Sequence, residues 1–161
     1  MNIDTEKSIY GRKAKELFLN GYNCSQAVFL AFADKYNMDD KTAMKISSSF
    51  GGGMGRLREV CGAASGMFMV AGMLYGYDEP MDYEAKKTHY ERIQELAEYY
   101  RQANGSDSII CRTILGVSGK DNPVPEKRTA EYYKKRPCPE LVAIAAAIME
   151  QYIAEHPIKA F

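Results

Sequence analysis

The stretch from Val60 to Tyr75 reads VCGAASGMFMVAGMLY, and it decides the fold. Small and apolar residues continue almost all the way round a helix here, which is typical of a helix that is central and buried. Gly62 and Gly66 lie within this helix. Each costs about 1 kcal/mol relative to alanine. We therefore expect another helix, or a bulky centre, to approach the backbone closely at these glycines.

The sequence on both sides of this stretch also has helical periodicity. Apolar residues recur at spacings of three and four, between start and stop signals such as Asn20-Gly21 and Asn104-Gly105. The pattern predicts an all-α fold, a single-domain helical bundle of about six to eight helices over residues 1–161. The approximate helices are residues 10–20, 23–36, 40–49, 60–75 and 82–104, a short helix after Asp107-Ser108, and a last helix from Cys138-Pro139, with a loop at 116–125.

Charge and composition exclude several classes of function. Lys plus Arg and Asp plus Glu both number 21, so the formal net charge is zero. A binder of nucleic acid or of an anionic membrane needs a concentrated basic surface, so we expect no nucleic-acid partner. The opening residues MNIDTEK lack the apolar core of a signal peptide, and no apolar run reaches the ~20 residues of a membrane span. We expect a cytoplasmic protein without membrane insertion or lasting disulfides.

Four cysteines are distributed along the chain without any close pair. There is no C-x-x-C motif, zinc-finger spacing or haem attachment signal, so only the fold can bring them together. Each falls in or next to the first turn of an expected helix. The expected positions are the first residue after the cap Asn23 for Cys24, the opening of the central helix for Cys61, the third position after the cap Ser108 for Cys111, and the N-cap before Pro139 for Cys138.

These positions have a chemical meaning. A helix N-terminus carries free N–H groups and the positive end of the helix dipole, which favour a thiolate and lower the pKa of a cysteine. Arg56 and Arg58 either add positive potential beside Cys61 or are solvated surface charges. The competing interpretation is that each cysteine is simply a small buried apolar residue.

A glycine-rich run, GGGMGRLR at residues 51–58, precedes Cys61. It lacks the strand–loop–helix context and the Gly-Lys-Ser/Thr ending of a phosphate loop, so we expect no nucleotide. The glycines either let the backbone pass close to a cluster and the other cysteines, or form a flexible turn. On the first interpretation, Gly52, Gly53 and Gly62 are the candidate cofactor-binding residues.

Several motifs together resemble the C_GCAxxG_C_C family of putative redox-active proteins, from about Gly21 to the last helix. These motifs are NCSQAV at 23–28, the glycines of 51–55, CGAxxG at 61–66, and the single cysteines Cys111 and Cys138. The family label writes Gly before Cys, whereas here Cys61 precedes Gly62. The resemblance implies a small bacterial or archaeal protein with four characteristic cysteines, often encoded near transporters. A related module occurs in a haem cytochrome that also carries an iron–sulfur centre.

Two kinds of redox chemistry fit four gathered cysteines, which makes all four candidate catalytic residues. They either ligate an iron–sulfur cluster or a metal ion, which we favour, or they work in pairs by thiol–disulfide exchange. We expect no haem, because the attachment motif is absent. A structural zinc site fits less well, since such sites usually draw ligands from close pairs.

A function of another class is also open. The chain would then be a helical accessory module, with a transporter as its partner and cysteines of purely structural use. We find no general acid–base pair and no cofactor fingerprint in the sequence, so it predicts no substrate. The electron donor or acceptor, and the choice between monomer and homo-oligomer, stay open.

Overall fold

The computed structural model describes residues 1–159, and its fold is all-α, as predicted. The α-helices are α1 (Ile9–Leu19), α2 (Cys24–Ala31), α3 (Asp40–Ser47), α4 (Gly51–Met54), α5 (Gly62–Tyr75), α6 (Tyr83–Ala103), α7 (Cys111–Leu115), α8 (Ala130–Lys135) and α9 (Cys138–Glu155). α4 is a single distorted turn, because Gly52 and Gly53 have left-handed φ angles of 68° and 69°. None of the described helices combines the length and the apolar character needed to cross a membrane.

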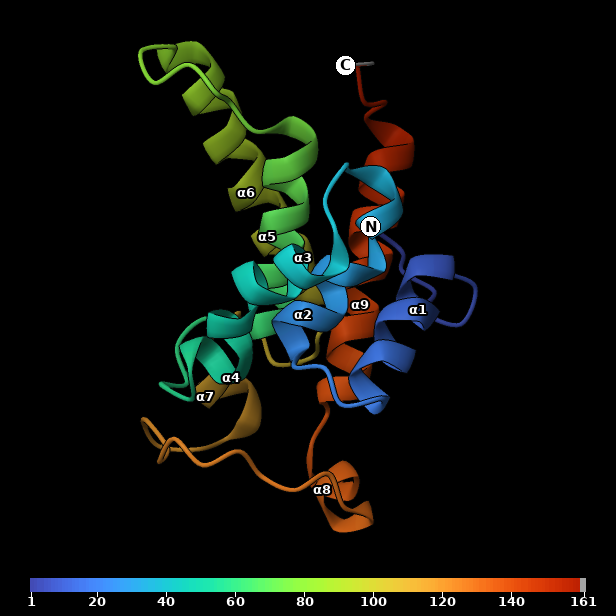
Figure 1. Cartoon of the computed structure of the whole chain (residues 1–161), viewed down its shortest axis with the longest axis vertical. Helices are drawn as coiled ribbons and strands as arrows, with labels where there is room; N and C mark the ends of the chain where they lie inside the picture. The colour runs from blue at the N-terminus through green and yellow to red at the C-terminus, as the bar shows by residue number, and fades with distance from the viewer. Residues whose placement is uncertain (160–161) are drawn as a thin grey trace.

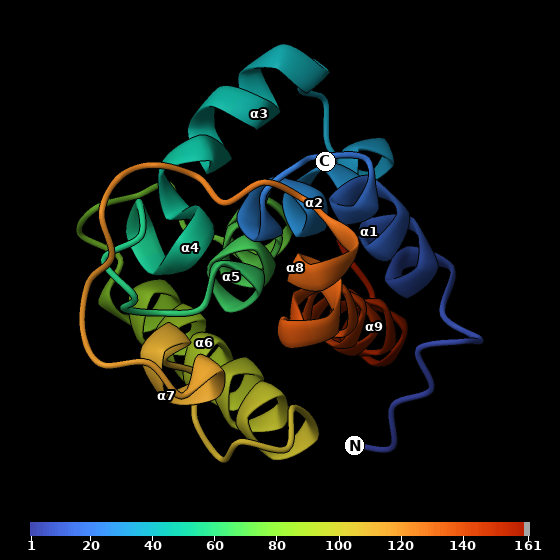
Figure 2. The same cartoon turned by 90° about the horizontal axis from the view of Figure 1, so that it is seen from below.

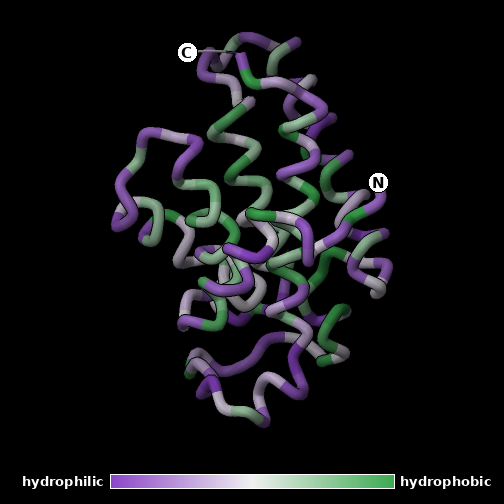
Figure 3. Tube along the Cα trace, turned by 90° about the vertical axis from the view of Figure 1, so that its right-hand side faces the viewer, coloured by the Kyte–Doolittle hydropathy of each residue, from purple (hydrophilic) through white to green (hydrophobic). Residues whose placement is uncertain are grey.

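α5 and α9 form the centre of the bundle (Figures 1 and 2). α9 packs against α1, α2, α5 and α6, and α5 also packs against α2 and α6. Buried apolar side chains from these helices, among them Phe29, Met67 and Ile148, belong to one cluster. Figure 3 shows hydrophobic residues along the inner helices and hydrophilic residues along much of the outer chain. The prediction of a central, buried helix is confirmed.

Gly62 and Gly66 set the distance between α5 and α2. A Cβ on Gly62 would overlap Cys24 Sγ, and a Cβ on Gly66 would lie 2.8 Å from the carbonyl oxygen of Ser25. No side chain fits into these spaces, so glycine is required for the two helices to pack this closely. The expected close approach of another helix is therefore confirmed.

Two predicted helix ends are wrong. α2 ends at Ala31 rather than near Tyr36, and α3 ends at Ser47 rather than at Ser49. In each case a 3₁₀ turn replaces the last part of the predicted helix: η1 (Ala33–Lys35) and η2 (Ser48–Phe50). After α2 the chain turns back over that helix. There the Tyr36 hydroxyl donates a hydrogen bond to the backbone carbonyl oxygen of Phe29 in α2.

One helix start and one short helix also differ from the prediction. Cys111 is the first residue of α7, not its third, because Ser108 Oγ accepts a hydrogen bond from the N–H of Ile110 in the extended chain before the helix. The sequence pattern did not predict α8, a short helix capped by Thr129.

Residues 116–129, here named the connecting segment, join α7 to α8 without helix or strand. This agrees with the predicted loop at 116–125. Figure 2 shows the connecting segment passing round one end of the bundle, past α4 and α2. Asp121 ties it down, because its carboxylate pairs with Arg58 at 2.8 Å and its N–H donates to the carbonyl of Arg56 at 3.0 Å.

Candidate functional site

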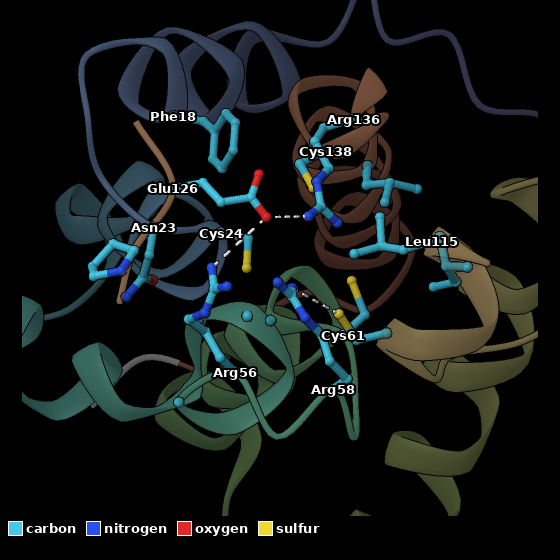
Figure 4. A pocket seen from close by; sticks show the side chains of 18 of the residues that line it. Phe18, Asn23, Cys24, Arg56, Arg58, Cys61, Leu115, Glu126, Arg136 and Cys138 are labelled. Atoms are coloured by element: carbon cyan, nitrogen blue, oxygen red, sulfur yellow. Dashed lines mark hydrogen bonds and ion pairs between the residues drawn. The ribbon is translucent and has the colours of Figure 1, made fainter. Parts of the chain in front are cut away.

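One cavity of about 280 Å³ has all four cysteines in its lining (Figure 4). Cys24, Cys61, Cys111 and Cys138 reach it from the N-terminal ends of α2, α5, α7 and α9. All four thiols are free. The helix starts meet at one end of the bundle, and this meeting brings together cysteines that are distant in sequence.

A capping box at the start of α2 positions Cys24. Asn23 Oδ1 accepts a hydrogen bond from the N–H of Gln26 at 2.9 Å, and Gln26 Oε1 accepts one from the N–H of Asn23 at 3.0 Å. Cys24 is therefore the first residue of the helix, as predicted. Its Sγ lies against Gly62, and the backbone N–H of Gly52 acts to lower the pKa of the thiol.

A short antiparallel bridge brings Cys61 and Cys111 together. Val60 pairs with Ile110, and the N–H of Cys61 donates to the carbonyl of Ile109 at 2.8 Å. The residues just before α5 and α7 are thus held side by side. Cys61 is the N-cap of α5, and Cys111 is the first residue of α7. Both thiols therefore lie at the same edge of the cavity.

Tyr100 of α6 is the hydrogen-bond partner of Cys61. Its side chain is fully buried, and its hydroxyl oxygen lies 3.2 Å from Cys61 Sγ. Burial raises the pKa of Tyr100 well above its usual value, so the phenol keeps its proton and can donate it in a hydrogen bond to the sulfur. The contact of Tyr100 with a cysteine was not predicted from the sequence.

Arg58 contacts Cys111. Arg58 Nη1 lies 3.6 Å from Cys111 Sγ, and Arg58 Nε donates to Asp121 Oδ2 at 2.8 Å. The arginine is only 5% exposed, so the alternative of a solvated surface charge is wrong for this residue. Arg58 was expected to add positive potential beside Cys61. This expectation needs correction too, since its hydrogen bond goes to Cys111 Sγ.

Burial raises the pKa of three of the cysteines: Cys24, Cys61 to about 12 and Cys138 to about 12. Removal of water disfavours the thiolate, and neighbouring cysteines add to the effect. Backbone N–H groups act in the opposite direction at Cys24 and Cys61, but more weakly. The prediction that helix N-termini lower the pKa is therefore wrong for these three cysteines, which are neutral thiols at neutral pH.

The three candidate cofactor-binding glycines do not share one position. Gly52 and Gly62 line the cavity, whereas Gly53 is not part of its lining. A Cβ on Gly53 would lie 2.7 Å from Cys111 Cβ, so glycine is needed there for the packing of α4 on α7. The left-handed φ angles of Gly52 and Gly53 agree with the expectation that this run brings the backbone close to the cysteines.

Three charged residues, here named the charged rim, form another part of the cavity lining: Arg56, Glu126 and Arg136 (Figure 4). Arg136 Nη2 donates to Glu126 Oε1 at 2.5 Å, and Arg56 Nη1 lies 3.9 Å from the same oxygen. The sequence analysis missed Arg136 and Glu126. They belong to segments without a recognisable motif, and only the path of the connecting segment brings them to the cysteines.

The cysteines surround the cavity rather than meet at one point. Within residues 1–159, no three or more His, Cys, Asp or Glu side chains are grouped closely enough to hold a metal ion as they stand. Electrostatic coupling nevertheless links the thiols across the cavity: Cys24 and Cys111 both raise the pKa of Cys138, and Cys24 raises that of Cys61.

A comparison with protein-family models gives one match. The model described as "Putative redox-active protein (C_GCAxxG_C_C)" matches residues 22–152, which is most of the chain and includes all four cysteines. No curated protein and no solved structure matches the chain.

Proposed function

Because the chain belongs to the C_GCAxxG_C_C family of putative redox-active proteins, we propose that it is a redox protein whose four cysteines bind an iron–sulfur cluster. One observation carries the proposal: all four cysteines line the same cavity. Four cysteine thiolates are the ordinary ligand set of two-iron and four-iron clusters. In a four-iron cluster each thiolate binds a different iron, so ligands that stand around a cavity suit it.

The backbone and charges of the cavity also fit a cluster. A cluster held by four thiolates is negatively charged and would be stabilised by N–H donors and by cations. Here the backbone N–H of Gly52 acts to lower the pKa of Cys24, and the guanidinium of Arg58 donates to Cys111 Sγ at 3.6 Å. Because Gly62 has no side chain, Cys24 can lie directly against the start of α5.

The chain's own residues would tune the reduction potential. When bound, an iron–sulfur cluster accepts and releases electrons through its iron atoms. Hydrogen bonds from Tyr100 to Cys61 and from Arg58 to Cys111 favour the more negative, reduced state and so raise the potential. Burial of the sulfurs acts in the opposite direction, because a dry surrounding disfavours added negative charge.

Thiol–disulfide exchange is the alternative, and the thiol pKa values argue against it at neutral pH. Its nucleophile is a thiolate, and burial leaves little thiolate on Cys24, Cys61 and Cys138. Metal ligation does not meet this obstacle, because the metal displaces the thiol proton as it binds. Neutral thiols with raised pKa values around one cavity therefore support the ligand role.

Anaerobic purification, followed by iron and acid-labile sulfide analysis, tests the proposal. We expect a brown protein with about two or about four iron atoms, and as many sulfides, per chain. The double variant Cys61→Ser, Cys138→Ser should lose both. A Met81→Ser variant, changed at a residue that is 68% exposed, should keep both.

Two results would contradict the cluster. A colourless chain that takes up one zinc ion and no sulfide after reconstitution would establish a single-ion site. A metal-free chain that loses its four thiols in two-electron steps on mild oxidation would establish disulfide chemistry instead.

A further inference from the structure

In the charged rim, the Glu126 carboxylate lies between two guanidinium groups whose side chains are mostly buried. The side chains of Arg56 and Arg136 are 17% and 14% exposed, whereas that of Glu126 is 41% exposed. Both arginines direct a nitrogen at the same oxygen of Glu126. Two guanidinium groups arranged in this way recognise carboxylate, sulfate and phosphate groups.

The other arginines of the cavity have partners elsewhere. Arg58 is engaged by Asp121 and a cysteine sulfur. Arg128 donates to the backbone carbonyl oxygen of Phe18 in α1 at 2.9 Å and to that of Tyr22, between α1 and α2, at 3.1 Å. Arg56 also pairs with Asp121 at 3.8 Å, but Asp121 is not part of the cavity lining. Within the lining, Glu126 is the carboxylate on which Arg56 and Arg136 converge.

Glu126 lies in the connecting segment, which is hydrogen-bonded to Arg56 a few residues before Glu126. Arg56 Nε donates to the carbonyl of Asn122 at 2.7 Å, and the next residues, with Pro123 and Pro125 in the cavity lining, lead to Glu126. The contacts of Glu126 with the arginines pass through its side chain. Its carboxylate can therefore leave without breaking a helix.

We propose that Arg56 and Arg136 form the binding site for the oxyanion group of a small substrate of the redox centre, and that Glu126 occupies this site until the substrate replaces it. Exchange is feasible because an ion pair with a partly exposed partner contributes little, about 0–1 kcal/mol. The cavity volume of about 280 Å³ limits the ligand to a small molecule. The inference rests on the proposed function only in treating the sulfurs as the redox centre.

Alkylation of the full-length, metal-free chain with two matched reagents tests the site. Iodoacetate carries a carboxylate, and iodoacetamide is its neutral counterpart of similar size. With either reagent the thiolate attacks the methylene carbon, a C–S bond forms and iodide leaves. Mass spectrometry gives the rates at Cys24 and Cys138, the partly exposed cysteines. Each rate is divided by that of the urea-unfolded chain.

Glu126→Gln should open the site to an external anion. We expect it to raise the normalised iodoacetate rate about tenfold more than the iodoacetamide rate, since the guanidinium groups of Arg56 and Arg136 then lack the Glu126 carboxylate and attract the charged reagent. Adding Arg136→Gln, or Arg56→Gln, to this variant should remove the preference. Glu131→Gln is the matched control: it removes the same charge from an exposed carboxylate that pairs with Lys135, outside the cavity lining.

Either of two outcomes would overturn the inference. Equal acceleration of both reagents in Glu126→Gln would mean that Glu126 only covers the thiols. An equal preference in Glu131→Gln would mean that overall charge, not the charged rim, steers the reagent.

Competition identifies the oxyanion. In Glu126→Gln, succinate, sulfate or phosphate should slow iodoacetamide labelling relative to chloride at the same ionic strength. Protection by succinate alone indicates a carboxylate substrate, and protection by sulfate or phosphate indicates a tetrahedral oxyanion. Protection by none of them overturns the site. Iron and sulfide content is measured separately, so loss of the cluster proposal and loss of this site are distinguishable.

Discussion

Different interactions stabilise the two sides of the cavity. On one side, Cys61, Cys111 and Tyr100 form what we name the sulfur floor, where every side chain is at most 7% exposed. Packing and a backbone bridge hold them in place. On the other side, the charged rim depends on ion pairs with a carboxylate that is 41% exposed.

This difference teaches where the protein tolerates change. Buried packing and a buried hydrogen bond cost folding free energy when altered, because no water can replace the lost contacts. Partly exposed ion pairs exchange with water and salt at little cost. The cavity is therefore fixed where it holds the sulfurs of Cys61 and Cys111, and adjustable where a ligand would enter.

Gly62→Ala should have the largest effect on the free energy of unfolding, because it disrupts the packing beside the sulfur floor. Its Cβ would overlap Cys24 Sγ and lie 2.9 Å from the carbonyl oxygen of Phe50, so α2 and α5 must move apart. Overpacking of about 3 kcal/mol, offset by about 1 kcal/mol of helix propensity, predicts a loss of about 2 kcal/mol in the free energy of unfolding. Urea denaturation measures it.

Gly72→Ala is the matched control in the same helix. Nothing lies within 4 Å of the position that its Cβ would take, so we expect an unchanged or slightly higher free energy of unfolding, by up to about 1 kcal/mol. Equal effects of the two substitutions would show that close packing does not fix the sulfur side of the cavity.

The raised thiol pKa values predict that the metal-free protein loses stability at alkaline pH. Cysteine titrates near pH ~8.5 in an unfolded chain, but Cys61 and Cys138 have pKa values of about 12 in the fold. Above pH ~8.5 the unfolded chain releases protons that the folded chain keeps, so the unfolded state gains stability. The contribution of the neutral thiols is complete below that pH and is lost as the pH rises toward the folded values.

Urea midpoints measured between pH about 7.5 and about 10 check this sign. They should fall in the wild-type chain and fall less steeply in Cys138→Ser, which lacks one of the thiols with a raised pKa. A wild-type midpoint that stays constant over this range would contradict the burial of neutral thiols.

Tyr100→Phe should have a moderate effect, since it removes one hydrogen bond and keeps the ring. Loss of the bond to Cys61 costs about 1 kcal/mol of folding free energy. In the iron-loaded protein it should also make the reduction potential more negative, because a sulfur loses its donor. Tyr99→Phe is the control, since that hydroxyl bonds Glu95 instead. An unchanged potential in Tyr100→Phe would separate Tyr100 from the redox centre.

Local signals in the sequence predicted much of the sulfur side of the cavity. The capping box at Asn23 and Gln26 is a short-range motif, so it placed Cys24 correctly. The glycines of 61–66 predicted a close helix contact, because glycine lowers helix stability and this cost can be recognised from the sequence alone. Cys111 was misplaced, because Ser108 bonds a residue ahead of the helix rather than capping it.

Tertiary structure decided what the sequence could not. Helical periodicity carries no information about which sulfur the Tyr100 hydroxyl contacts. The sign of the cysteine pKa shifts was wrong because it depends on a competition between helix N–H groups and burial, and burial is known only from the fold. Glu126 meets Arg56 through the path of a segment without regular structure, which no local pattern predicts.

Asp121→Asn should have the smallest effect on global stability, because it weakens only the ion pairs of the connecting segment with Arg58 and Arg56. Asp121 is partly exposed, so we expect no measurable change in the urea midpoint. Amide hydrogen exchange within residues 116–129 should become faster. The Arg58 guanidinium lowers the pKa of Asp121, so acid below pH about 4 should loosen the wild-type segment in the same way. A midpoint lowered as far as in Gly62→Ala would mean that this charged tie is as structural as the packing around the sulfurs, and the contrast between the two sides would fail.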